Sequence, residues 1–140
     1  MLLSGGRLVT RRSAASVVSG WIRAINAADL PGFLRDLQDD CVLVEPQHTY
    51  LGKGNLTRWF EMVVVHRSST LRLISAHDAE PDHLLAWAEW HAKSFHDEVT
   101  LWTPLAVLTT SGRIREIHIS PPMRVPVPVM SPSEPEESAA

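Results

Sequence analysis

Apolar residues recur at helical spacing in three stretches of the first half of the chain. The first stretch follows Ser13, which can cap a helix, and the second follows Asp29, which can cap a shorter one. The third runs from Asn55 to about His66, and its β-branched end, residues 62–65, is expected to fray or to pass into extended chain. The apolar positions that define the three predicted helices are Val17, Val18, Trp21, Ile25, Ala28, Phe33, Leu34, Leu37, Leu56, Trp59, Phe60 and Val63.

Alternating apolar and polar residues dominate the remaining chain and predict strands. One short strand, residues 41–44, lies between the second and third helices and ends at Glu45-Pro46, because proline cannot donate to a sheet. Residues 47–54 read as a loop. The later strands are predicted at residues 70–77, 83–94, 99–109 and 113–120, with turns at 78–82, 95–98 and 110–112.

This order of elements predicts an α+β domain. Three N-terminal helices would pack on one face of a strongly curved, mostly antiparallel sheet, leaving a cone whose open end can hold a ligand. We assign the domain to residues 13–120. Residues 1–12 are expected to be a flexible lead, and residues 121–140 a tail rich in Pro, Ser and Glu that is partly disordered, with an extended strap at 125–129.

Charge and composition narrow the classes of function. The formal net charge of the 140-residue chain is -3, and the glutamates of the tail account for it, so the body offers no basic field for nucleic acid or an anionic membrane. No apolar run approaches the roughly 18 residues of a membrane span. The single cysteine, Cys41, cannot form an internal disulfide, which fits a cytoplasmic protein. The histidines lack zinc-ligand spacing and no phosphate-binding loop is present, so neither a metal nor a cofactor is expected.

Several short motifs, in this order, resemble the nuclear transport factor 2-like (NTF2-like) superfamily over about residues 14–120. They are Trp21-Ile with Asn26-Ala-Ala-Asp29-Leu, Asp39-Asp-Cys-Val-Leu-Val-Glu-Pro46, Gly52-Lys-Gly before the third helix, and Gly112-Arg-Ile-Arg-Glu-Ile. The SnoaL-like polyketide cyclase and ketosteroid isomerase branches are the most similar. The resemblance implies a cystatin-like cone. It leaves function open, because this superfamily contains enzymes, binding proteins and assembly modules.

Glu45 is the first candidate for catalysis. The resemblance places it where ketosteroid isomerases keep the aspartate that shuttles a proton, which implies a general base. Two departures argue against authentic steroid isomerisation. Trp21 occupies the position where that family has a tyrosine donor, and Pro104 occupies the position of the acidic residue that assists the tyrosine. The alternative is an ordinary carboxylate at a solvent-facing strand end.

Glu89 and His91 are the second and third candidates. Alternation along the strand at 84–93 puts them on one face with Leu85 and Trp87, and Trp90 on the other face among alanines. The resemblance puts the first set inside the cone, where Glu89 and His91 would assist Glu45, and leaves Trp90 as a dimer contact. In the opposite register, Glu89 and His91 are solvated and the Ala/Trp face packs on the helices or on a partner.

Aromatic side chains are the candidates for binding an apolar ligand, although they could equally fill the core. Tyr50 also lies, with His48, in the loop beside Glu45, where a lid or an ordinary exposed loop is expected. The candidate ligand-binding residues are Trp21, Tyr50, Trp59, Phe60, Trp87 and Trp102.

The sequence therefore favours a small cofactor-independent acid–base enzyme of isomerase, cyclase, dehydratase or epoxide-hydrolase type. Its partners would be a hydrophobic small molecule and a second copy of the chain. The alternative is a non-catalytic binding or dimerisation module of the same fold. A scaffold whose acidic, proline-rich tail docks a partner is a third hypothesis.

Overall fold

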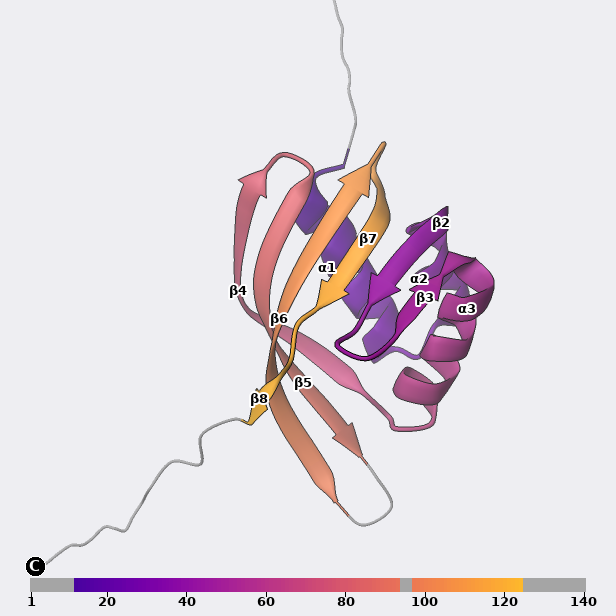
Figure 1. Cartoon of the computed structure of the whole chain (residues 1–140), viewed down its shortest axis with the longest axis vertical. Coiled ribbons are helices and arrows are strands. Elements are labelled where there is room, and N and C mark those ends of the chain that lie inside the picture. The colour runs from indigo at the N-terminus through magenta and orange to yellow at the C-terminus, as the bar shows by residue number, and fades with distance from the viewer. Residues whose placement is uncertain (1–11, 94–96, 125–140) are drawn as a thin grey trace, which may run out of the picture.

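The computed structural model describes residues 12–93 and 97–124 and consists of helices packed into a curved sheet (Figure 1). The elements in chain order are α1 (Ala14–Asn26), α2 (Leu30–Arg35), β2 (Leu37–Val44), β3 (Thr49–Leu51), α3 (Gly52–Trp59), η1 (Phe60–Val65), β4 (Thr70–Glu80), β5 (His83–Lys93), β6 (Glu98–Thr110), β7 (Arg113–Ile119) and β8 (Met123–Arg124).

The strands form one mixed sheet in the order β3-β2-β7-β6-β5-β4, with β8 paired to β6. Every pairing is antiparallel except that of β2 with β7. Register shifts interrupt three of the ladders, at residues 37–42, 73–75, 78–80 and 108–109, and such irregularities increase the twist of a sheet. The sheet therefore curls, as Figure 1 shows, and the predicted α+β cone is confirmed.

Helix α1 fills the hollow of the cone. Its N-cap Ser13 accepts a hydrogen bond from the backbone N–H of Ser16, and its buried face includes Val17, Trp21 and Ile25. At its other end Asn26 exchanges two hydrogen bonds with the backbone of Leu71, at 2.9 and 2.7 Å, and so ties α1 to the edge strand β4. The core lies between this helix layer and the concave face of the sheet.

The start of helix α2 and the turn between β6 and β7 form at the residues predicted from the sequence. Asp29 caps α2 by accepting a hydrogen bond from Gly32 N–H at 3.1 Å. The turn between β6 and β7 has positive φ at both Ser111 and Gly112, as a two-residue hairpin requires.

Three elements differ from the prediction. Residues 49–51 form β3 instead of a loop, because they pair with residues 42–44 of β2. Strand β2 already begins at Leu37, whose apolar side chain had been assigned to the preceding helix. The β-branched end of the third helix neither frays nor extends but continues as the π-helical turn η1, which buries Phe60 and Val64.

Residues 1–11, 94–96 and 125–140 are outside the described residues. They include nearly all of the lead that was predicted to be flexible, part of the β5–β6 connection, and most of the proline-rich tail with its predicted strap. The predicted domain limits therefore stay predictions. None of the described helices has both the length and the apolar character needed to cross a membrane.

Candidate active site

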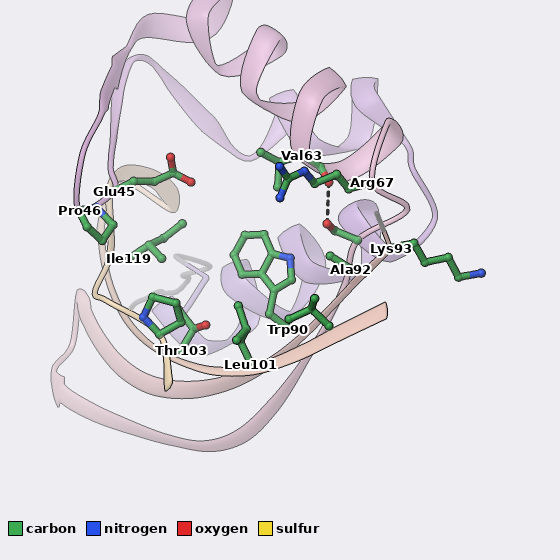
Figure 2. A pocket seen from close by; sticks show the side chains of 13 residues that line it. Glu45, Pro46, Val63, Arg67, Trp90, Ala92, Lys93, Leu101, Thr103 and Ile119 are labelled. Carbon is green, nitrogen blue, oxygen red and sulfur yellow. Dashed lines mark hydrogen bonds between the residues drawn. The ribbon is translucent and has the colours of Figure 1, made fainter. Parts of the chain in front are cut away.

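A cavity of about 260 Å³ opens between η1, the concave face of β5 and β6, and the ends of β2 and β7 (Figure 2). Its volume is slightly below the range of about 300–1,000 Å³ that is typical of small-molecule pockets. The lining is mostly apolar, and its polar and charged members stand at separate points of the wall. The lining residues are Glu45, Pro46, Val63, Arg67, Ser69, Trp90, Ala92, Lys93, Val99, Leu101, Thr103, Ile119 and Pro122.

Glu45 is held rigidly at the end of β2. Its backbone N–H donates to the carbonyl of His48 at 2.8 Å, closing the turn into β3. Its side chain is half-buried, and Oε2 accepts a hydrogen bond from the indole Nε1–H of Trp59 at 3.0 Å. Trp59 is itself fully buried, so this donor cannot swing away. One carboxylate oxygen is thus anchored on the cavity wall while the other can face a ligand.

The opposite wall comes from the β-branched end of the third helix. The π-helical geometry of η1 places Val63 against the cavity, and the hydroxyl of Ser69 donates to the Val63 carbonyl at 2.6 Å. Wide helical turns of this kind often occur where a side chain must be placed for function. Here the turn supplies an apolar surface facing Glu45.

Thr103 supplies a hydroxyl to the floor of the cavity. The residue lies on the inner face of β6 and is 2% exposed. Among the described residues, no hydrogen bond to this hydroxyl is found. A hydroxyl that lines a cavity and makes no hydrogen bond to the protein is suited to bond a polar atom of a ligand.

Trp90 is the largest apolar side chain of the cavity, and it lies at the centre of Figure 2. Its ring packs edge-on against Trp59, with 6.0 Å between the ring centroids. Trp59 stacks in turn on Phe33, and Phe33 on Trp21. An aromatic row therefore connects the cavity to α1, and it holds the donor of Glu45 in place.

Tyr50 lies near Glu45 but does not line the cavity. It stands opposite Leu43 in the β2–β3 pair and is half-buried against the core. Burial first, and the negative charge of Glu45 second, raise the pKa of the Tyr50 phenol above its ordinary value. His48 is exposed and lies 6.2 Å from the Tyr50 ring, centroid to centroid. Neither side chain forms a lid over the cavity.

Three further predicted ligand-binding residues belong to the core, and one of them, Trp59, reaches the site only through its bond to Glu45. Trp21 is fully buried and absent from the cavity lining, and Phe60 is 1% exposed. The indole N–H of Trp21 has no hydrogen-bond partner within the described part of the chain. Trp21 therefore cannot serve as the donor to a ligand oxygen in this cavity.

Glu89 and His91 do not converge with Glu45, which corrects the expected placement. Glu89 receives two hydrogen bonds from Arg72, at 3.2 and 2.8 Å, and these hold its pKa below the ordinary value. The ring nitrogens of His91 lie 3.0 Å from Thr100 Oγ1 and 3.0 Å from Glu98 Oε1. All of these groups project from the convex face of the sheet.

Trp87 and Trp102 share that convex face, so the second register considered for β5 is the observed one. The inner face of β5 carries the small residues Ala86 and Ala88, which let α1 approach the sheet, and then Trp90, which reaches the cavity. Trp90 is consequently not available as a dimer contact. Strict alternation defines the two faces of a strand but not which one is buried.

Sequence reasoning overlooked Arg67, Lys93 and Thr103 as site residues. Arg67 follows η1 in a turn, and Lys93 ends β5; the two meet through a 2.7 Å hydrogen bond from Lys93 N–H to the Arg67 carbonyl. No motif marks them, because the β4–β5 hairpin separates them in the sequence. Among the described residues, no group of three His, Cys, Asp or Glu side chains is arranged to hold a metal ion.

Comparison with known proteins gives matches of structure only. No family model matches the sequence, and no curated protein matches it significantly. Among solved structures, a Mycobacterium tuberculosis protein in complex with estradiol-17beta-hemisuccinate superimposes with a TM-score of 0.72 at 16% identity, covering 77% of this chain and 93% of that one.

Two more solved structures are similar to a comparable degree. A putative polyketide cyclase from Sinorhizobium meliloti has a TM-score of 0.64 at 18% identity, with 74% of this chain and 92% of that chain covered. The Delta 5-3-ketosteroid isomerase from a Mycobacterium species has a TM-score of 0.70 at 13% identity, with 77% and 92% covered. Together with the curved mixed sheet and its helix-filled hollow, these matches show that the chain has the NTF2-like fold.

Proposed function

We propose that this protein is a cofactor-independent acid–base catalyst for a hydrophobic carbonyl compound, with Glu45 as the base that removes a proton next to the carbonyl. The observation that carries the proposal is the bond from Trp59 to Glu45, which fixes a carboxylate on the wall of an otherwise apolar cavity. A fixed base beside a desolvated substrate needs little reorganisation in the transition state.

The other side chains of the cavity support the same reaction class. Trp90, Leu101 and Val63 offer surfaces for a flat apolar body. The free hydroxyl of Thr103 can donate to a substrate oxygen. Glu89 and His91 take no part, because they project from the other face of the sheet.

Solved proteins of this fold give the proposal a precedent in chemistry. They include an epoxide hydrolase/cyclase-like enzyme involved in pyran ring formation in the polyether salinomycin, and a protein co-crystallised with polyporic acid. The identity to each is 14% or lower, so the substrate and the exact reaction do not transfer to this chain.

Proton abstraction can be tested without knowing the natural substrate. Deuterium uptake next to the carbonyl of apolar two-ring ketones such as β-tetralone is followed by NMR in heavy water. The native protein should accelerate uptake over buffer, and Glu45→Gln should remove about a hundredfold or more of that acceleration. Glu80→Gln, which changes an exposed carboxylate at the end of β4, is the matched control and should have no effect.

The outcomes separate the alternatives. If Glu45→Gln keeps the full rate, Glu45 is not the base. If the protein binds such ketones but never accelerates exchange, the non-catalytic binding module is the better description.

We also propose a homodimer through the convex face of the sheet. Apolar side chains gather there around Trp102: Ile74, Leu85, Trp87 and Met123 are exposed by 42, 40, 41 and 49%. An apolar patch of this kind marks an interaction surface, and self-association is its commonest use. Sedimentation equilibrium should show a dimer that Trp87→Glu dissociates. Val65→Glu, which alters an exposed apolar residue on η1, should leave it intact; a native monomer would refute the dimer.

A further inference from the structure

One side of the cavity mouth is formed by two basic residues whose side chains point in different directions. Arg67 and Lys93 both contribute to the lining, and the backbone bond between them holds the two residues together. In Figure 2, the side chain of Arg67 extends across the cavity toward Glu45, whereas the side chain of Lys93 points away from it. The charged side chains that face the cavity are therefore one cation, Arg67, and one carboxylate, Glu45, while Lys93 lines the rim with its ammonium turned outward.

Neither cation is neutralised by the protein in the described part of the chain. Salt bridges there engage Arg12, Lys53, Arg72 and Arg115 but neither Arg67 nor Lys93. Arg67 is exposed, so its guanidinium can adjust to a ligand without unfolding any element. A guanidinium offers paired donors for an oxyanion, and its positive charge persists at any physiological pH.

The apolar lining lies directly beneath this guanidinium. Trp90, Leu101 and Ile119 are apolar members of the lining and lie below Arg67 in the view of Figure 2. A molecule that fills the cavity would thus put its ring body on Trp90 and its outer end at Arg67. An acidic group at that end would find a partner, and a cationic group would be repelled.

We propose that the ligands of this protein are apolar organic anions, with a compact ring body in the cavity and one acidic group bound by Arg67. This inference rests on the proposed function in that it places the ligand in the same cavity, but it does not depend on Glu45 acting as a base.

Arg67 can also stabilise negative charge on a substrate oxygen, a role that neither Trp21 nor Pro104 can fill here. Trp21 is sealed in the core, and Pro104 faces the convex side of the sheet opposite Trp87. When Glu45 removes a proton from a substrate, negative charge develops on the substrate oxygen. A cation on the facing wall stabilises that charge. The same guanidinium would therefore select the ligand and stabilise its enolate.

Two fluorescent dyes with the same ring system test the inference: anilinonaphthalene sulfonate, which is an anion, and N-phenylnaphthylamine, which is neutral. The native protein should bind the sulfonate more tightly. Arg67→Gln should weaken sulfonate binding about 10- to 100-fold, as expected for the loss of a charge-assisted pair. Binding of the neutral dye should change less than about twofold.

Arg113→Gln is the matched control, because Arg113 is exposed at the β6–β7 turn, at the other end of β6 from the cavity. It should leave the binding of both dyes unchanged. Circular dichroism and thermal unfolding verify that each variant is folded, and the indole N–H signal of Trp90 verifies that the dye occupies the cavity.

Failure of the inference is distinguishable from failure of the proposed function. If the native protein binds both dyes equally and Arg67→Gln changes neither, the cavity binds ligands but does not select anions, and the inference is wrong. If neither dye binds, the cavity is not a ligand site. Deuterium exchange that depends on Glu45 but not on Arg67 would support the base and contradict the role of Arg67.

Discussion

The indole N–H of Trp59 and the carboxylate of Glu45 lie 3.0 Å apart, and this bond joins the aromatic core to the cavity. Trp21 offers a natural comparison. Both tryptophans are fully buried in the same aromatic row, but the N–H of Trp21 has no partner in the described part of the chain.

Replacing each of these tryptophans by phenylalanine should therefore have different effects on stability. Both changes remove the same volume. Trp59→Phe also breaks a hydrogen bond to a carboxylate, whereas Trp21→Phe removes an unsatisfied donor, and each of these contributions is worth about 1–3 kcal/mol. Urea unfolding should show Trp59→Phe to be more destabilising than Trp21→Phe by at least about 1.5 kcal/mol. Equal losses would mean that the bond to Glu45 contributes nothing.

The titration of the neighbouring Tyr50 phenol reports on the charge of Glu45, because Tyr50 is the single tyrosine of the chain and its signal is unambiguous. The Glu45 carboxylate helps to raise the pKa of Tyr50. Removing that negative charge makes the tyrosinate less unfavourable, so Glu45→Gln should lower the pKa of Tyr50. Absorbance of the ionised phenol measures this directly, and Glu80→Gln should leave the titration unchanged. A Tyr50 titration that is identical in Glu45→Gln would show that the carboxylate lies farther away.

Asn26 should be a sensitive position for folding. Its amide makes two part-buried hydrogen bonds to the backbone of the buried residue Leu71 on the edge strand β4, so Asn26→Ala removes the side-chain partner of both the N–H and the C=O of Leu71. We expect a loss of about 2–4 kcal/mol in unfolding free energy. Asn55→Ala is the matched control: Asn55 makes one exposed bond within α3, where alanine favours the helix, so its loss should be under about 1 kcal/mol. Equal losses in the two variants would contradict the bridging role.

Cys41 should be inert in the folded protein. Burial first, then the charges of Asp40 and Glu116, raise the pKa of the Cys41 thiol to about 12. The thiol stays protonated in the folded state, while in the unfolded chain it ionises near its ordinary value of about 8.5. The contribution of the Cys41 thiol to the free energy of unfolding is therefore fully present below about pH 8.5. Above that pH the contribution falls by about 1.4 kcal/mol per pH unit.

Comparison of urea unfolding at pH 8 and pH 10 tests this effect. Between the two pH values, the unfolding free energy of the native protein should fall by about 2 kcal/mol more than that of the Cys41→Ala variant. Iodoacetamide should label Cys41 only as fast as the protein opens. Labelling at the rate of a free thiol would contradict its burial.

Local patterns predicted the elements well and the site only in part. The caps at Ser13 and Asp29, the turn at residues 110–112 and the position of Glu45 at a strand end all follow from short-range chemistry. The order of elements was enough to predict the cone, because a run of long antiparallel strands follows the last helix.

The face of the sheet on which each candidate side chain lies could not be predicted from the sequence pattern. Alternation along β5 cannot tell whether Glu89 or Trp90 faces the helices. The close approach of α1 to Ala86 and Ala88 decides this in favour of Trp90. Arg67 precedes β4, and it meets Lys93 only because β5 runs back along β4 and ends beside the start of that strand, a contact between distant segments that no local motif records.

The cavity beside Trp90 and Glu45 is the proposed binding site for small apolar molecules. The chain has five tryptophans, and their indole N–H signals report separately on the cavity, the core and the convex face. Titration with N-phenylnaphthylamine, followed by NMR, should shift the signals of Trp90 and Trp59 and leave those of Trp21, Trp87 and Trp102 in place. Shifts confined to Trp87 and Trp102 would put the ligand on the convex face and contradict the account.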